Sequence, residues 1–270
     1  MAGRVSRQPE QAQALAAAQW DVVCLQEVTP TPLWPWREAL TAAGLANLRS
    51  SMDEWLPGNP PPEGRRLGVL TAARAPLEVI AAAYPPWPER LLSVRVEADR
   101  PYELHNLPSP ISQKPDRVKL RTHRALHAHL ARPLELPQVV TGDFNTPRRE
   151  RPDGTAWSFA RTSRGHLRSD RGEDWEAAEL SVLRGLEEHG IRDVYRALHG
   201  PERHDISWSY PRRKGGYRID HILASHHFEP VACDYLHAVR EAGLSDHSAM
   251  WAELHMSVRG RQRAVAASRP

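Results

Sequence analysis

Asp143 and Asn145 stand two residues apart in the stretch PQVVTGDFNTP, residues 137–147. They follow the apolar pair Val139 and Val140, which indicates a buried strand. In an extended chain, side chains two residues apart point to the same face, so a carboxylate and an amide would project together from this strand tip. The alternative is an ordinary turn, because Gly, Asp, Asn and Pro all favour turns.

Polar residues of the same kind follow three other apolar segments. VVCLQEV carries Glu27 at its end, GGYRIDHIL carries Asp220, and GLSDHSAM places Asp246 and His247 just before the last apolar segment. Burying a charge inside a strand costs several kcal/mol of folding free energy, roughly, unless the charge is paired or bound to a metal. One such residue can be accidental, whereas four at matching strand ends predict a single converging site.

The residue types at these ends suit metal-assisted chemistry on phosphate esters. Carboxylates bind Mg²⁺, which polarises a phosphoryl oxygen and offsets developing charge. A histidine held by a carboxylate acts as a base or, when protonated, stabilises a transition state, and the sequence does not choose between these roles. Taken singly, each residue also has a structural explanation: a surface acid for Glu27, an ion pair with Arg218 for Asp220, and a polar turn for Asp246–His247.

The elements that would position these residues follow from the apolar periodicity. Helices are expected over residues 7–19, 33–44, 116–131 and 173–190, and loops over 50–66 and 147–172. Strands are expected over 21–27 and 138–144, onward from Leu67, Pro76, Arg90 and Tyr102, and in the closing segments ISWSY, YRIDHILAS, FEPVACDYL and SAMWAEL. This order predicts an α/β domain with two packed sheets and outer helices rather than a βαβ repeat.

Length and composition point to one domain. The 270 residues include 40% hydrophobic residues, which supports a sizeable core over residues 7–256, while 257–270 form a basic tail that we expect to be disordered. Two isolated cysteines form no disulfide framework, and no apolar run is long enough for a membrane span. We therefore expect a soluble, cytoplasmic monomer.

The motifs LQE, GDFN, RIDHIL and SDH, in this order, resemble those of the endonuclease/exonuclease/phosphatase superfamily, which includes the DNase I-like nucleases. The segment from SWSY to GGYRIDHILAS is similar to the Trp-then-Asp block of that family. The resemblance spans about residues 8–254. It implies an α/β fold of the four-layer sandwich type, in which two mixed sheets pack face to face with helices outside.

The resemblance also implies a role for each matching residue. Glu27 matches the metal-binding Glu, and Asp246 is a second metal contact, with Mg²⁺ as the cofactor and Mn²⁺ as the alternative. Asp143 and Asn145 match the pair that orients the attacking water and holds the phosphate. The catalytic pair that the family pattern implies is His247, oriented by Asp220.

His105, in YELHNLPSP, resembles a histidine that serves the leaving group in DNase I-like members. Other members have Asn-x-His instead, and Asn106-Leu107-Pro108 departs from that spacing. We therefore keep two interpretations of His105, as a catalytic residue and as a loop histidine with satisfied hydrogen bonds.

The segment 147–172 contains seven arginines, beginning with Arg148 and Arg149 directly after the Asp143 strand. These arginines could bind a phosphate backbone, and Trp157 and Phe159 could stack on bases. The alternatives are a solvated, partly disordered loop and aromatic rings that pin the loop to the body. The pI of about 9.1 adds little, because only three of the 36 basic residues are lysines and compositional bias explains this excess of arginine equally well.

These observations favour a nuclease acting on nucleic acid by in-line attack of water on a phosphodiester. The runner-up is a small-molecule or lipid phosphodiesterase, or an enzyme acting on phosphomonoesters. A third interpretation is an inactive member that binds phosphorylated ligands. His123 and His127, four residues apart on a helix with His129 nearby, have a zinc-like spacing, but no acidic third ligand accompanies them in the sequence and we do not predict a site there.

Members of the superfamily begin with a strand that ends in Asn and precedes the first helix. Here about 20 residues precede Asp21, they are typical of the helix alone, and no Asn precedes Gln26. We expect one sheet to lack that first strand. A start codon assigned too far downstream explains this better than a truncated paralogue, because the other motifs are all present.

Overall fold

The computed structural model describes residues 5–29, 33–53, 67–81, 85–111, 117–133, 135–212 and 214–257. The basic tail and most of the expected loop 50–66 lie outside these ranges. In the described part, no helix has the length and apolar character needed to cross a bilayer.

The larger sheet has the strand order β10-β13-β7-β6-β5-β4. Among the strands of the described residues, β6 and β7 form its one parallel pair, so the sheet is mixed. The bounds are β4 Leu77–Val79, β5 Leu92–Val96, β6 Tyr102–Asn106, β7 Gln138–Asp143, β10 Ile191–Asp193 and β13 Asp220–Ser225.

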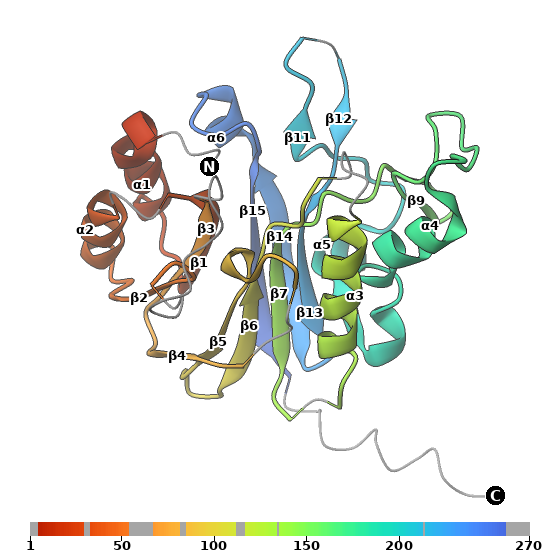
Figure 1. Cartoon of the computed structure of the whole chain (residues 1–270). Coiled ribbons are helices and arrows are strands. Elements are labelled where there is room, and N and C mark those ends of the chain that lie inside the picture. The colour runs from red at the N-terminus through yellow and green to blue at the C-terminus, as the bar shows by residue number, and fades with distance from the viewer. Residues whose placement is uncertain are drawn as a thin grey trace, which may run out of the picture.

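The opposing layer contains two smaller sheets, ordered β1-β3-β2 and β14-β15. Figure 1 shows helices α1 and α2 outside this layer and α3 and α4 on the other side of the molecule, whereas α5 contributes Val194 and Tyr195 to the core between the sheets. The strands are β1 Val22–Val28, β2 Asn47–Ser50, β3 Gly68–Ala73, β14 Phe228–Leu236 and β15 Ala249–Met256. The helices are α1 Gln8–Ala16, α2 Trp34–Ala42, α3 Val118–Leu130, α4 Gly172–Ser181, α5 Val194–His199 and α6 His237–Glu241, with 3-10 turns at Val5–Arg7, Pro88–Arg90 and Glu187–His189.

Strand alternation divides the apolar side chains of the sandwich among three cores, and a fourth, smaller cluster in the described residues contains Leu120 of α3 and Trp175 of α4. On β7, Val139 points into the core between the sheets, where it joins Leu104 of β6 and Tyr235 of β14. The next residue, Val140, points outward and packs with Leu126 of α3. Consecutive strand residues face opposite sides, so one strand serves two cores.

The third core lies between α1 and α2 and the outer face of β1 and β3. Trp36 and Leu40 of α2 pack there against Leu25 and Leu70 and are fully buried. Helices, two face-to-face layers of strands and helices thus follow one another, and the predicted four-layer sandwich is confirmed.

One strand layer is split. β1 pairs with β3 and β15 pairs with β14, and within the described ranges no strand pairs with the second edge of either. Among the described residues, these two edges therefore face each other across the split without a shared strand. Across the split, the rings of Trp20 and Trp251 lie 6.5 Å apart.

Some local predictions were wrong. The helix expected over 173–190 ends at Ser181 and is followed by turns and a 3-10 turn, consistent with Gly185 in its interior, since glycine is a poor helix former. The expected loop 147–172 contains a short hairpin, β8 Arg149–Glu150 with β9 Ala156–Trp157. A second hairpin, β11 Trp208–Ser209 with β12 Gly216–Tyr217, projects from the body (Figure 1).

Candidate active site

The ends of two neighbouring strands bring two carboxylates together. β7 and β13 are antiparallel, and their register places Asp143, the last residue of β7, opposite Asp220, the first residue of β13. The backbone N–H of Phe144 donates to the carbonyl of Ile219 at 2.8 Å, which extends the pairing beyond the strands. Register therefore makes neighbours of two acids that are far apart in the sequence.

His247 reaches this pair from the other strand layer. Its Nδ1 atom lies 2.8 Å from Oδ2 of Asp220, and its backbone bridges to Trp208 of β11. One potential ligand atom from each of Asp143, Asp220 and His247 lies within 4.8 Å of the other two. The structure thus brings together three of the residues predicted from the sequence.

Asn145 stabilises the turn that follows Asp143. Its φ is +51°, a region that Asn tolerates better than most residues. Its backbone N–H and its side-chain amide donate to the two carboxylate oxygens of Asp143, at 2.8 and 2.9 Å, and the amide also donates to the Ser109 carbonyl at 2.7 Å. Asn145 therefore lies in a turn rather than in extended chain, and this turn itself orients Asp143.

The three groups of the cluster change one another's affinity for protons. Burial, reinforced by the charge of Asp220, raises the pKa of Asp143 to about 7. Burial alone would raise the pKa of Asp220, but the charge of His247 and its hydrogen bond outweigh it, so this pKa is lowered. Burial would lower the pKa of His247, but Asp220 outweighs it and raises that pKa to about 9. At neutral pH the cluster therefore favours an imidazolium on His247 and a carboxylate on Asp220, and Asp143 binds a proton more readily than an ordinary carboxyl group does.

Glu27 and Asp246 border the cluster without joining it. Glu27 lies at the irregularity where β1 shifts register, with φ of +57°, and its charge contributes to the raised pKa of Asp143. Asp246 contributes similarly to the raised pKa of His247. Within the described ranges, neither side chain has a hydrogen-bond or ion-pair partner, although both are partly buried. Partly buried, unpaired carboxylates beside further acids are a donor set that fits a hard divalent cation.

His105 does not reach the cluster, which corrects its assignment as a catalytic residue. It lies on β6 between Leu104 and Asn106, both of which face the interior between the sheets, so its own side chain faces outward toward α3. Its Nδ1 atom lies 2.7 Å from the Ser93 hydroxyl. The segment YELHNLPSP suggested a catalytic histidine, but the alternation of side chains along β6 determines that His105 points away from the cluster.

The residue that does face the interior is Asn106, which sequence reasoning missed. Its amide donates to the Leu70 carbonyl at 3.0 Å and its oxygen accepts from Gln26 at 2.7 Å, so it links the two strand layers beside Glu27. An Asn at the end of an apolar strand was the available signal.

Lys119 of α3 was also missed. It is fully buried, its Nζ donates to the carbonyl of Asn145 at 2.6 Å, and it lies 3.1 Å from Oε1 of Glu179. Lys119 and Glu179 therefore stabilise the turn that follows Asp143. A lysine in a chain whose basic residues are almost all arginines was the signal in the sequence.

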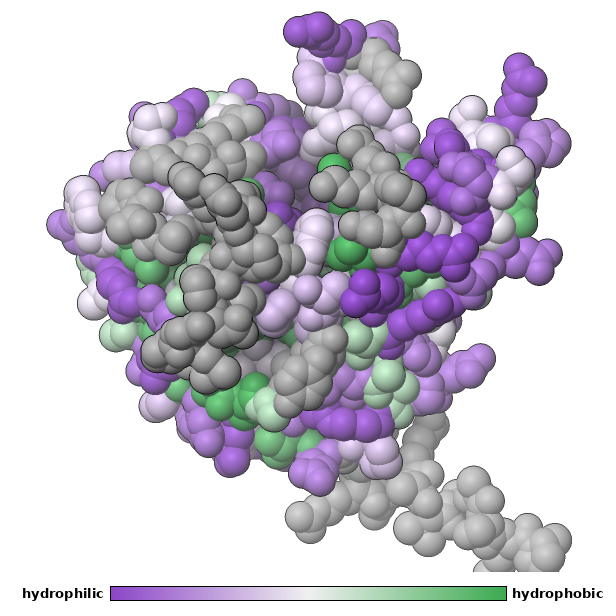
Figure 2. Space-filling view, viewed as in Figure 1, coloured by the Kyte–Doolittle hydropathy of each residue, from purple (hydrophilic) through white to green (hydrophobic). Residues whose placement is uncertain are grey.

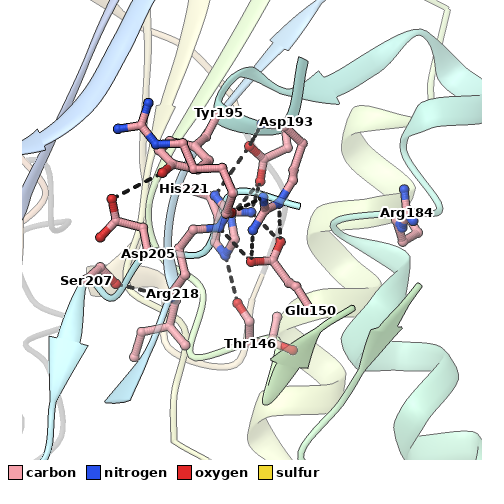
Figure 3. Close-up of polar contacts among 12 residues, drawn as sticks. Thr146, Glu150, Arg184, Asp193, Tyr195, Asp205, Ser207, Arg218 and His221 are labelled. Carbon is pink, nitrogen blue, oxygen red and sulfur yellow. Dashed lines mark hydrogen bonds and ion pairs between the residues drawn. The ribbon is translucent and has the colours of Figure 1, made fainter. Parts of the chain in front are cut away.

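A second buried network supports the strand that carries Asp220 (Figure 3). The guanidinium of Arg218 pairs with Glu150 at 2.6 Å and with Asp193 at 2.7 Å. His221 connects Asp193 to the carbonyl of Thr146 through its two ring nitrogens, each at 2.8 Å. The alternative that Asp220 serves only as a partner of Arg218 is therefore wrong, since Arg218 has its own acids.

The arginine-rich segment packs on its own aromatic rings. Arg148 lies over Phe159 and Arg149 over Trp157, at 5.8 and 5.5 Å from the ring centroids. Phe159 in turn contacts Tyr217 edge-on at 5.0 Å. Phe159 therefore connects the segment to the β11–β12 hairpin, whereas Trp157 packs against arginines of the segment itself. Within the described residues, Arg148 and Arg149 form no ion pair, and Figure 2 shows hydrophilic side chains gathered on the side where β9 and α4 lie.

Comparison with known proteins agrees with this geometry. The model of the Endonuclease/Exonuclease/phosphatase family matches residues 7–247. The chain belongs to this family. Members of the endonuclease/exonuclease/phosphatase family are metal-dependent hydrolases of phosphate esters, so the enzyme class expected from the sequence is confirmed.

Solved structures show the same fold at low identity. An AP endonuclease from Archaeoglobus fulgidus superposes with a TM-score of 0.69 and 21% identity, over 94% of this chain and 96% of that one. An endonuclease/exonuclease/phosphatase from Beutenbergia cavernae gives 0.62 and 19%, over 93% of this chain but 66% of that one, so this chain spans just under two thirds of its length. A mannosyl-6-phosphatase from Bacteroides thetaiotaomicron gives 0.56 and 17%, over 93% and 91%. A search of curated proteins gives no match.

Proposed function

We propose that this protein is a magnesium-dependent nuclease that hydrolyses phosphodiester bonds by in-line attack of water. The observation that carries the proposal is the Asp220–His247 pair beside Asp143, at the ends of strands from both layers. An imidazolium, a carboxylate and a nearby set of hard oxygen donors match the negative charge of a phosphate ester and the cation that would offset it.

Each residue of the cluster has a distinct role in this reaction. Asp220 holds Nδ1 of His247, which leaves Nε2 for the substrate. The raised pKa of His247 favours the imidazolium, so this residue offsets phosphate charge rather than acting as the base. Asp143, held by Asn145, orients the attacking water and takes its proton.

The metal would be held by Glu27, with Asp246 as a second contact. When bound, Mg²⁺, or Mn²⁺ in its place, polarises the phosphoryl oxygen and offsets charge in the transition state.

Arg148 and Arg149 support nucleic acid as the substrate. They follow the Asp143 turn directly and form no ion pair in the described part of the chain, so they are available for backbone phosphates beside the site. The similarity to an AP endonuclease points the same way. The similarity to a mannosyl-6-phosphatase keeps a small phosphate ester as the second candidate.

The test is hydrolysis of bis-p-nitrophenyl phosphate with and without Mg²⁺, followed by a panel of DNA, RNA, abasic duplex, sphingomyelin and inositol phosphates. We expect metal-dependent turnover that falls at least about 10²-fold in both His247→Ala and Asp143→Asn. His255→Ala, at an exposed position of β15, is the control and should leave turnover unchanged. Metal-dependent turnover that survives in both variants would remove the cluster from the reaction. No turnover on any substrate would favour an inactive member that binds phosphorylated ligands.

A further inference from the structure

A second group of metal-ligating side chains lies on the outward face of β6. Glu103 and His105 are two residues apart on this strand and share that face. His129, in the last turn of α3, meets them, and its ring lies 5.2 Å from that of His105 in an edge-on contact. One ligand atom from each of the three residues lies within 4.8 Å of the other two. This cluster is separate from the catalytic one, which Asn106 borders from the opposite face of β6.

In the described part of the chain, two of these side chains have a buried nitrogen that forms no hydrogen bond. His105 is fully buried, and its Nε2 atom lies 3.6 Å from Oε2 of Glu103, beyond hydrogen-bonding distance. Within the described ranges, neither this atom nor Nε2 of His129 has a hydrogen-bond partner. Leaving a buried polar atom unpaired costs about 1–3 kcal/mol, so two of them beside a carboxylate require an explanation.

We propose that Glu103, His105 and His129 bind a zinc ion. Two imidazole nitrogens and one carboxylate are a common ligand set for zinc, with water in the fourth position. Ligands at about 2.0–2.1 Å in a tetrahedral site lie about 3.4 Å from one another. The 3.6 Å between His105 and Glu103 is close to this value, and His129, half-buried at the helix end, needs only a side-chain adjustment to complete the set.

Hydrogen bonds from neighbouring residues orient two of the proposed ligands. Ser93 lies 2.7 Å from Nδ1 of His105 and directs the ring so that Nε2 faces the site. Oε2 of Glu103 accepts hydrogen bonds from Gln138 at 2.9 Å and from Arg132 at 2.5 Å. Such outer partners typically orient metal ligands.

Arg132 also has an opposing effect. Its positive charge lies beside the carboxylate and repels a cation, so it weakens binding at this site. This gives the proposal a directional test, because removal of the guanidinium should strengthen zinc binding. A polar cluster that exists only for structural reasons would show no such gain.

The experiment is titration of the full chain with Zn²⁺, and with Co²⁺ to record the visible absorption of a nitrogen-containing site. Because Glu27 and Asp246 would also hold a metal and the catalytic cluster contains a histidine, each titration is made on the double variant Glu27→Gln/His247→Ala as well as on the original protein. We expect one equivalent of metal to remain in this double variant, to weaken at least about 10-fold when His129→Ala is added, and to tighten when Arg132→Gln is added.

Loss of metal from the double variant Glu27→Gln/His247→Ala, or equal affinity in this double variant with and without His129→Ala, would overturn the proposal. Anomalous diffraction at the zinc edge on the original protein gives a test that does not depend on a variant that folds. Density between Glu103, His105 and His129 supports the site, whereas density at Asp143 alone refutes it.

Discussion

Nδ1 of His247 lies 2.8 Å from Oδ2 of Asp220, although the two residues come from different strand layers. Asp220 begins β13 of the larger sheet, and His247 precedes β15 of the opposing layer. The pair is thus formed only when the two layers pack face to face. It couples assembly of the sandwich to assembly of the site.

Asp220→Asn should lower kcat by at least about 10²-fold, with a much smaller change in KM. The amide keeps the shape of the carboxylate but cannot hold the imidazolium by charge. Steady-state kinetics on bis-p-nitrophenyl phosphate measure the effect. Asp234→Asn, a half-exposed acid paired with Arg203, is the control and should behave as the original protein does. An unchanged kcat in a folded Asp220→Asn protein would contradict the role of the pair.

Glu27→Gln should raise the Mg²⁺ concentration needed for half-maximal activity, because the amide preserves the shape but loses the charge that attracts the ion. Activity measured against Mg²⁺ concentration gives this midpoint directly. Glu229→Gln, exposed on β14, should leave it unchanged. The same midpoint in both variants would place Glu27 outside the metal site.

Replacing Arg148 and Arg149 together by Ser should weaken binding to polynucleotides. The dependence of binding on salt should also decrease, by about one unit of slope for each backbone phosphate that these arginines neutralise. Hydrolysis of a small phosphodiester should hardly change, because groups that bind the backbone position the strand rather than perform chemistry. The matched control is Arg184→Ser with Arg192→Ser, which removes two exposed arginines from outside this segment. If both double variants bind DNA and RNA equally well, the arginine-rich segment is not a nucleic-acid surface.

Lys119→Met should destabilise the protein by about 3–5 kcal/mol, because it leaves the carboxylate of Glu179 buried without its charge partner. Turnover should also fall, since Lys119 anchors the carbonyl of Asn145. Urea unfolding measures the first effect. Combining Lys119→Met with Glu179→Gln should cost less than the sum of the single changes. Strict additivity would show that the two residues are not coupled.

Stability should fall as the pH drops below about 6.5 because of His123. Burial, with a further contribution from the charge of Lys119, lowers its pKa from 6.5 to about 3. Between these values the unfolded chain binds the proton and the folded protein does not, so each pH unit removes about 1.4 kcal/mol of stability. His123→Gln should lose about 2 kcal/mol less than the original protein between about pH 7 and pH 5. Urea unfolding at both pH values, with exposed His255→Gln as control, tests this, and parallel losses in all three proteins would refute it.

The sequence alone determined the residue types at the strand ends and the order of the elements. Apolar periodicity indicated most strands and the helices α1, α2 and α3, because burial of one face leaves a local signature. Glu27, Asp143, Asp220 and His247 stood out because charged or polar groups at the ends of apolar strands require a reason.

Only the tertiary structure decided which of these residues meet. The register of β7 and β13 made neighbours of Asp143 and Asp220, and alternation on β6 turned Asn106 toward the interior and His105 toward α3. The same packing brought His129 to Glu103 and His105, a combination that no local spacing reveals. The physical reason is that a shift of one residue in a strand reverses the face of every side chain, while the energy that sets register comes from the packing of distant segments.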